Sequence, residues 1–291
     1  MTTPTTPTDI QSKILIVKPT IRKVGQSKTD EDLTEEVHGN HAMDSTAGAY
    51  VKKLWPKQFI APFTKIEGEF RRFHKRNSVV SRFGDLVPTV RFEDYNQRAQ
   101  EYAERFSSAA DDFCANYDAI IEEAKRIHNG AFRPDFYPTK DSIRSEFSFT
   151  LLTSPVPRID DIAVNYLCEE RVEQIRQELS ATVDEAAKAA TQQVIARLLE
   201  CVRNIASKLS DPEAIFRDSL IENLRSMLAI APALNIADDP TVIQLMSECN
   251  EKLLRDPTVI RGSTFQREIT ANYANQIAAS FGNVGGRKIA A

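Results

Sequence analysis

Two long stretches of the chain carry apolar residues every three or four positions, and neither stretch contains a glycine or a proline. The first runs from about residue 93 to 128, and the second from about 160 to 209. This spacing places the apolar side chains along one face of an α-helix. Periodicity of such length favours long helices packed as in a coiled coil or a long hairpin over a compact bundle.

A third helix is predicted between residues 56 and 80. Its apolar positions are three or four residues apart and form one seam: Phe59, Phe63, Ile66, Phe70 and Phe73. Pro62 is expected to kink the start of this helix. The segment RFGDLVP at 82–88 is typical of a turn, so we expect the helix at 93–128 to run back antiparallel to this one.

Two short segments have the patterns of β-strands. A β-branched run extends from Ile14 to Val17, and Phe147, Phe149 and Leu151 alternate with polar residues. We expect these segments to pair as a two-stranded element. The polar stretch at 25–48 predicts a loop or a mobile insertion around a short acidic helix.

The C-terminal region is punctuated by Asp-Pro pairs at 211–212, 239–240 and 256–257. Aspartate is a good N-cap and proline a good first helical residue, so each pair predicts the start of a helix. STFQ at 263–266 has the form of a capping box and predicts a last helix to about residue 280.

Together these patterns predict a mainly α fold. We expect an elongated antiparallel bundle of long, coiled-coil-like helices, a small two-stranded β element and a C-terminal lobe of short helices. The predicted divisions are a disordered tail at 1–9, the long-helix domain at 10–210, the lobe at 211–280 and a flexible basic tail at 281–291.

The charge of the chain is unevenly distributed along its length. The net charge of −4 gives no general attraction to nucleic acid or to an anionic membrane. Residues 48–91, however, hold ten Lys or Arg against three Asp or Glu, whereas residues 92–127 hold four against nine. Adjacent predicted helices therefore carry opposite charge.

The cysteines and the N-terminus indicate a cytoplasmic protein. The four cysteines are widely separated and form no CxxC pair, which favours buried thiols in a reducing compartment. The polar N-terminus does not resemble a signal peptide, and no apolar run has the ~20 residues of a membrane span.

No catalytic, cofactor-binding or metal site is predicted. The chain lacks the GxxxxGK[ST], GxGxxG, GxSxG and HExxH motifs. His38 and His41 lie near carboxylates, but glycine and asparagine separate them and no third ligand is near, so a solvated loop is the preferred interpretation. We therefore expect a protein that is not an enzyme, and an enzyme of unrecognised class stays as an alternative.

The strongest candidate surface is a set of basic residues that lie off the aromatic seam or just beyond the helix: Arg71, Arg72, Lys75, Arg76 and Arg82. The first interpretation is pairing with the acidic residues of the 93–128 helix, or solvation. The second is contact with a partner protein or nucleic acid, with the basic groups on phosphates. The phenylalanines of the seam are assigned to the core and not to base stacking.

The order of three motifs resembles a known family. KLWPKQFIAPFTKIEGEFRRF, SRFGDLVP and SEFSFTLLTSP, in that order, are similar to an uncharacterised DUF3150-like family of bacteriophage and prophage proteins. The resemblance covers residues 10 to about 209 and implies a phage or phage-derived origin, in which case the expected compartment is the host cytoplasm. Genes of such families often lie near those of MoxR-type AAA+ ATPases and von Willebrand factor A-type proteins, which implies an adaptor role.

These observations lead to two expected functions. The first is a non-enzymatic interaction, assembly or adaptor protein that associates through its long helices with itself or a partner protein. The second is a nucleic-acid-binding phage protein that uses the basic residues around 71–82.

Overall fold

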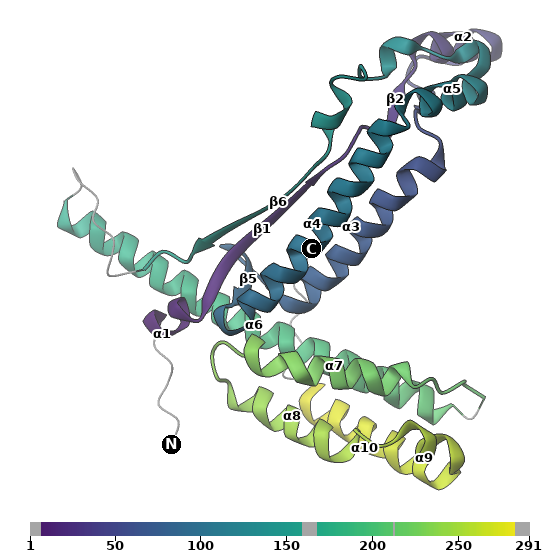
Figure 1. Cartoon of the computed structure of the whole chain (residues 1–291). Helices are drawn as coiled ribbons and strands as arrows, with labels where there is room; N and C mark the ends of the chain where they lie inside the picture. Colours follow the sequence, from purple (N-terminus) through teal and green to yellow (C-terminus); the bar gives the residue numbers. More distant parts are fainter. Residues whose placement is uncertain (1–6, 159–167, 212, 283–291) are drawn as a thin grey trace. The chain divides into compact units, whose positions relative to one another are not determined.

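The computed structural model describes residues 7–158, 168–211 and 213–282 (Figure 1). It is mainly helical, with a small antiparallel sheet, as the sequence predicts. The chain divides into two compact units. Unit 1 contains residues 1–18, 75–95 and 153–291, and unit 2 contains residues 19–74 and 96–152.

Unit 2 is organised around the aromatic seam of α3 (Lys57–Asn77). The rings of Phe63 and Phe70 are almost fully buried, and they meet Phe106 and Tyr102 of α4 (Phe92–Ala115). In Figure 1 these two helices lie side by side. The predicted antiparallel pairing of α3 with α4 is therefore confirmed.

The predicted strand segment near residue 147 also contributes to this aromatic core. Phe147, which precedes β6 (Ser148–Pro155), stacks on Phe63 with ring centroids 4.6 Å apart. Phe149 meets Phe70 edge-on at 4.8 Å. Aromatic pairs in these arrangements contribute roughly 0.5–1.5 kcal/mol beyond the burial of their surface.

The predicted helix at 93–128 is two helices. α4 ends at Ala115, and α5 (Tyr117–His128) begins after Asn116. The side-chain amide of Asn116 donates to the carbonyl oxygen of Asp112 at 2.8 Å, beside the backbone N–H of the same residue. Such local side-chain bonds compete with helical backbone geometry, which explains a break that the apolar spacing does not reveal.

The predicted turn at RFGDLVP is confirmed at Arg82 and Phe83, but it is the turn of a β-hairpin that the sequence did not predict. α3 ends at Asn77, and the chain then forms a hairpin of β4 (Val79–Ser81) and β5 (Gly84–Pro88). The buried side chains of Val79, Leu86 and Val87 favour this strand pairing.

The β element predicted with two strands is a sheet of four strands. Its order is β4-β5-β1-β6, and β1 (Ile14–Arg22) pairs antiparallel with β5, with Ile14 opposite Pro88. The expected pairing of β1 with β6 is confirmed. β5 was missed because its sequence also has the composition of a turn.

A second, two-stranded sheet and a short helix form the region predicted as a loop or insertion. β2 (Ser27–Thr29) pairs antiparallel with β3 (Val51–Lys53), and α2 (Glu31–His41) lies between them in the sequence. The predicted acidic helix is thus confirmed, and it includes the histidines that were expected in a loop. Asp30 caps α2 by accepting a hydrogen bond from the N–H of Leu33 at 3.2 Å.

Unit 2 also contains short 3-10 turns that connect α5 to β6. They are the segments Asn129–Ala131, Pro134–Phe136 and Ile143–Glu146. A further 3-10 turn, Thr89–Arg91, precedes α4 in unit 1.

Unit 1 is organised around α6 (Glu169–Ser210). Within the described residues four further helices follow, and three of them pack against α6: α7 (Ser219–Leu234), α8 (Pro240–Lys252) and α10 (Thr264–Gly282). The short α9 (Pro257–Gly262) packs on α10, and α1 (Pro7–Ser12) packs on α6. Residues 160–167 of the predicted long helix lie outside the described residues.

Two of the three Asp-Pro predictions are confirmed. Asp239 and Asp256 accept from the N–H groups of Thr241 and Thr258, each at 2.8 Å, at the starts of α8 and α9. Ser263 likewise accepts from the N–H of Gln266 at 3.3 Å at the start of α10.

The prediction of a helix starting at Asp211 is wrong. Asp211 ends α6, and the next helix begins at Ser219. The guanidinium of Arg267 donates to the carbonyl oxygens of Leu209, Asp211 and Ala214, at 3.2, 2.5 and 2.9 Å. These bonds satisfy backbone acceptors that a continuing helix would use, and they hold the segment after α6 in an irregular conformation.

The compact units divide the chain differently from the predicted domains. The predicted boundary at residue 210 separates α6 from α7 to α10, and all of these belong to unit 1. The segments expected to be disordered or flexible, at 1–9 and 281–291, lie largely outside the described residues.

Candidate functional site

Arg71 and Arg72, the first two of the predicted basic residues, are exposed on α3 in unit 2. Arg71 forms a bidentate contact with Glu67, one turn earlier on the same helix, at 2.7 and 2.9 Å. Burial raises the pKa of the Glu67 carboxyl, but hydrogen bonds from Lys23 and Arg71 outweigh this effect and lower it. Arg72 forms no ion pair within the described residues.

The other three basic residues, Lys75, Arg76 and Arg82, are exposed in unit 1. Arg82, in the turn between β4 and β5, pairs with Glu185 of α6 at 3.2 Å. The backbone carbonyl of Arg76 accepts from Arg197 at 3.4 Å. In the part of the chain that the structure describes, neither Lys75 nor Arg76 has a carboxylate partner.

The expected pairing of a basic α3 with an acidic α4 is reversed in the ion pair that links these helices. Arg105 of α4 donates to Glu69 of α3 at 2.8 Å. This hydrogen bond, with smaller contributions from Lys65 and Arg72, lowers the pKa of the Glu69 carboxyl. The acidic partners of Arg71 and Arg82 lie on α3 itself and on α6.

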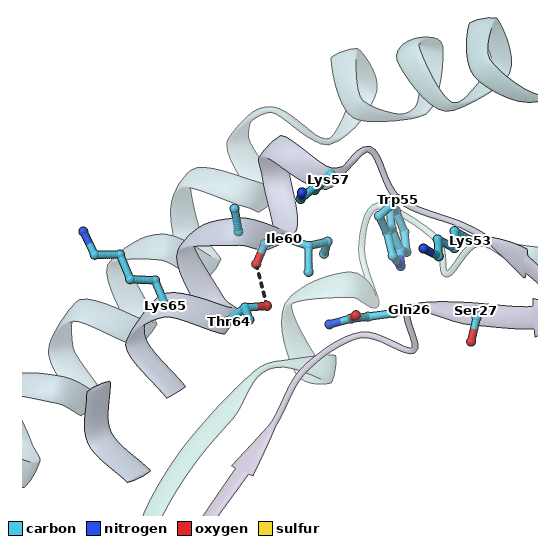
Figure 2. Close-up of a pocket in the computed structure, with 9 residues that line it drawn as sticks. Gln26, Ser27, Lys53, Trp55, Lys57, Ile60, Thr64 and Lys65 are labelled. Carbon is cyan, nitrogen blue, oxygen red and sulfur yellow. Dashed lines mark hydrogen bonds between the residues drawn. The ribbon is translucent and has the colours of Figure 1, made fainter. Parts of the chain in front are cut away.

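A pocket in unit 2 gathers lysine side chains that the sequence did not single out. It has a volume of about 600 Å³ and lies where the β2–β3 sheet meets the first turns of α3. We call it the lysine pocket, and its lining residues are Gln26, Ser27, Lys53, Trp55, Lys57, Ile60, Ala61, Thr64 and Lys65. Figure 2 shows Ile60 and Trp55 facing each other, with Lys53 and Lys57 beside them and Lys65 extending away from Trp55.

The alternation of β3 separates two neighbouring lysines. Successive strand residues point to opposite faces, so Lys52 is buried while Lys53 is exposed and lines the pocket. Lys52 and Asp30 form an ion pair in which each side chain is 2% exposed, and Lys52 also donates to the carbonyl oxygen of Ala131. The hydrogen bond from Lys52 to the carboxylate of Asp30 lowers the pKa of Asp30, despite the opposing effect of burial.

The apolar floor of the pocket is held in place by aromatic packing. Trp55 is only 7% exposed, and its ring meets Phe113 and Tyr137 edge-on at 5.3 and 5.1 Å. Its indole N–H donates to the carbonyl oxygen of Gly25 at 2.8 Å. These contacts fix the orientation of the indole ring in the floor of the pocket.

The rim of the pocket is electropositive. Within the described residues, Lys53, Lys57 and Lys65 form no ion pair, and the lining contains no carboxylate. The first turn of α3, which includes Lys57, also contains no acidic residue. Helix N-termini carry partial positive charge, so the start of α3 adds to the potential of the lysines.

A second candidate surface lies at the start of α6. In the described chain, the buried side chains of α6 begin at Val183, although the helix begins at Glu169. The apolar spacing continues towards the N-terminus through Leu179, Ile175 and Val172, which are only half-buried. Of these three, Leu179 packs against the core of unit 1.

The remaining candidates give no site of their own. Among the described residues, no group of three His, Cys, Asp or Glu side chains gathers as metal ligands. His38 lies with its Nε2 3.0 Å from the carbonyl oxygen of Gly48. Cys249 is fully buried, and burial raises the pKa of its thiol to about 12. None of the helices in the described ranges has the length and apolar character of a membrane span.

One family model matches most of the chain. Residues 14–231 match the sequence model of a family described as "Protein of unknown function (DUF3150)". The chain belongs to the DUF3150 family. The DUF3150 region includes the lysine pocket, all five predicted basic residues and the whole of α6, and it ends within α7. Neither a curated protein nor a solved structure matches the chain.

Sequence reasoning missed the lysine pocket although its signal was present. All three of its lysines fall in the basic segment at 48–91, and most of its lining lies in KLWPKQFIAPFTK, which carries part of the resemblance to DUF3150. On α3, Lys57, Ala61 and Lys65 are spaced four residues apart and share one face. The contribution of Gln26 and Ser27 depended on β2, which the sequence did not predict.

Proposed function

We propose that this chain is a non-enzymatic interaction and assembly protein of phage or prophage type, which associates with a second copy of itself through the start of α6. In this proposal, the two copies of the helix pack as an antiparallel or parallel coiled coil in the cytoplasm, and the assembly acts as an adaptor for an AAA+ ATPase. The phage origin and the ATPase rest on the motifs shared with DUF3150-like proteins.

The observation that carries the proposal is the half-buried seam at the start of α6. Val172, Ile175 and Leu179 continue the spacing of the buried residues that begin at Val183, at intervals of three and four. An apolar seam with this spacing stabilises a helix pair when another helix covers it. Charged residues lie beside the seam, as is typical of helices that associate in water: Glu169, Glu170, Arg171, Glu173, Arg176 and Glu178.

Sedimentation over a range of concentrations tests this proposal. We expect the wild-type chain to exceed the mass of the 32.7 kDa monomer as concentration rises. The substitution Ile175→Asp should shift the chain to monomer, because it places a charge in the seam. Gln177→Asp, at an exposed position of the same helix, is the control and should still associate. A wild-type chain that stays monomeric at all concentrations would contradict the proposal.

Nucleic-acid binding is a second candidate function, favoured by the exposed basic residues without carboxylate partners in the described chain. These are Arg72 in unit 2, and Lys75 and Arg76 in unit 1. Binding carried by such residues should weaken as salt concentration rises, and further when Arg72 and Arg76 are both replaced by Glu. Binding that is unaffected by salt and by the double substitution would exclude this function.

The gene neighbourhood separates the two candidates at little cost. An adjacent gene for an AAA+ ATPase favours the adaptor, whereas adjacent replication or recombination genes favour nucleic-acid binding.

A further inference from the structure

We infer that the lysine pocket is a binding site for a small organic phosphate, whose phosphate group lies among the lysines and whose apolar part lies on Trp55 and Ile60. This inference is independent of association through α6, which is on the other unit of the chain. It rests on the charge, the donors and the size of the pocket.

Lys53, Lys57 and Lys65 form no ion pair in the part of the chain that the structure describes. An exposed lysine on a protein surface is normally solvated, but here Lys53 and Lys57 come from different elements and flank the same apolar floor (Figure 2). Lys65 is oriented outward, and its flexible side chain allows its ammonium group to reach a bound anion. Nearby acidic residues such as Glu67 are already paired, with Lys23 and Arg71.

The kind of donor favours phosphate over carboxylate. A planar carboxylate is matched best by the fork of an arginine guanidinium, whereas lysine binds phosphate as a point charge. The lining contains lysines and no arginine. A phosphate monoester carries a charge of about −1.5 to −2 at neutral pH, so it gains more than a carboxylate from a site with several ammonium groups.

The remaining polar groups fit the extra oxygens of a phosphate. Gln26, the residue before β2, supplies an amide, and Ser27, the first residue of β2, supplies a hydroxyl. The hydroxyl of Thr64 donates to the carbonyl oxygen of Ile60 at 3.4 Å, a weak bond that an anion can replace. Helix N-termini are a common site for phosphate, and the first turn of α3 has no acidic residue.

The apolar floor and the volume define the rest of the ligand. A volume of about 600 Å³ is more than one phosphate occupies and lies within the roughly 300–1,000 Å³ range of small-molecule pockets. Ile60, Ala61 and the indole of Trp55 offer an apolar surface for a ring or a short hydrocarbon. We therefore expect an organic phosphate to bind more tightly than inorganic phosphate.

The fluorescence of Trp55 provides a direct readout, because it is the single tryptophan of the chain and it lines the pocket. The full chain is titrated with phenyl phosphate, inorganic phosphate, benzoate and sodium chloride at matched ionic strength, with calorimetry as a second readout. We expect saturable binding of phenyl phosphate, weaker binding of inorganic phosphate and benzoate, and no saturable change with chloride.

The substitution Ala61→Glu tests the location of the site without removing a lysine. Residue 61 is exposed, and it lies four residues from both Lys57 and Lys65, so the new carboxylate forms helical ion pairs with them and supports the fold. We expect the affinity for phenyl phosphate to fall by about tenfold or more, since hydrogen bonds to charged groups are each of that order. Ala119→Glu, the same change at an exposed position of α5 outside the pocket, should leave the affinity unchanged.

Each other outcome overturns the inference in a distinct way. Equal affinity for benzoate and phenyl phosphate would mean a general anion site and would refute the preference for phosphate. Equal binding by the wild type and Ala61→Glu would place the site elsewhere, and absence of binding to the wild type would refute the site altogether. None of these results bears on association through α6, which sedimentation measures separately.

Discussion

At the scale of single residues, two adjacent lysines of β3 have different environments because successive strand residues point to opposite faces. Lys52 is buried against Asp30, and Lys53 is left exposed at the rim of the pocket. Asp30 also caps α2, and its backbone N–H donates to the carbonyl oxygen of Tyr50 at 3.0 Å. Its partner Lys52 donates to the carbonyl oxygen of Ala131, so this ion pair joins α2, β3 and the segment at Ala131.

Loss of the Asp30 carboxylate should be costly. The substitution Asp30→Ala leaves the ammonium group of Lys52 buried without its partner, and breaking such a pair typically costs about 3–5 kcal/mol. Asp32→Ala is the control, because Asp32 pairs with Arg133 at the surface and such pairs contribute about 0–1 kcal/mol. Urea denaturation of both variants measures the free energy of unfolding, and equal losses would contradict the account.

The same pair predicts a dependence of stability on pH. The hydrogen bond from Lys52 lowers the pKa of Asp30 below its ordinary value of 3.8. A lowered folded-state pKa means that the stabilisation is complete above pH 3.8 and is lost as pH falls through the lower, folded-state value. The difference in unfolding free energy between the wild type and Asp30→Asn should therefore be constant at neutral pH and narrow below pH 3.8. A difference that does not change with pH would refute this role.

At the scale of elements, the edge of the four-stranded sheet is protected by a side chain from α6. β4 lies at one end of the strand order, so one side of its backbone has no neighbouring strand. Gln193 of α6 donates to the carbonyl oxygen of Val80 at 2.8 Å and accepts from its N–H at 3.0 Å. The amide thus takes the place of a further strand and reduces the tendency of the edge to pair with another chain.

Removal of this amide should destabilise unit 1 and expose the edge. Gln193→Ala removes two hydrogen bonds at a partly exposed site, each contributing about 0.5–1.5 kcal/mol. Gln192→Ala, at the adjacent exposed position, should have little effect. Thermal unfolding measures the stability, and light scattering on heating should show earlier aggregation of Gln193→Ala. Identical behaviour of the two variants would show that the edge does not need this amide.

Some helices and strands could be predicted from the sequence and others could not. The seam of α3 and the caps at Asp239 and Asp256 were predictable because each depends on residues close in the sequence. The β4–β5 hairpin was missed because its segment also has the composition of a turn, and β5 pairs further with the distant β1. The carbonyl groups of Asp211 and Ala214 are held by Arg267, which lies far along the chain, so no local pattern predicts the conformation there.

At the scale of the whole molecule, the candidate sites also depend on residues that are distant in the sequence, so the sequence alone located them only in part. The sequence located the basic segment at 48–91 but assigned its importance to residues 71–82, since these lie off the aromatic seam. The structure pairs two of those five residues with carboxylates, Arg71 with Glu67 and Arg82 with Glu185. It brings together instead the earlier lysines of the segment, through the sheet β2–β3 that the sequence did not predict.

Among the described residues, the lysines of the lysine pocket have no carboxylate partner, and a phosphate bound there should shield their ammonium groups from solvent. Acylation of the full chain with an amine-reactive reagent, quantified by peptide mass spectrometry, measures the accessibility of every lysine at once. In the presence of phenyl phosphate, we expect reduced labelling of Lys53, Lys57 and Lys65, and unchanged labelling of the exposed Lys188 on α6. Protection of Lys188 to the same degree, or no protection of the three pocket lysines, would contradict phosphate binding in the lysine pocket.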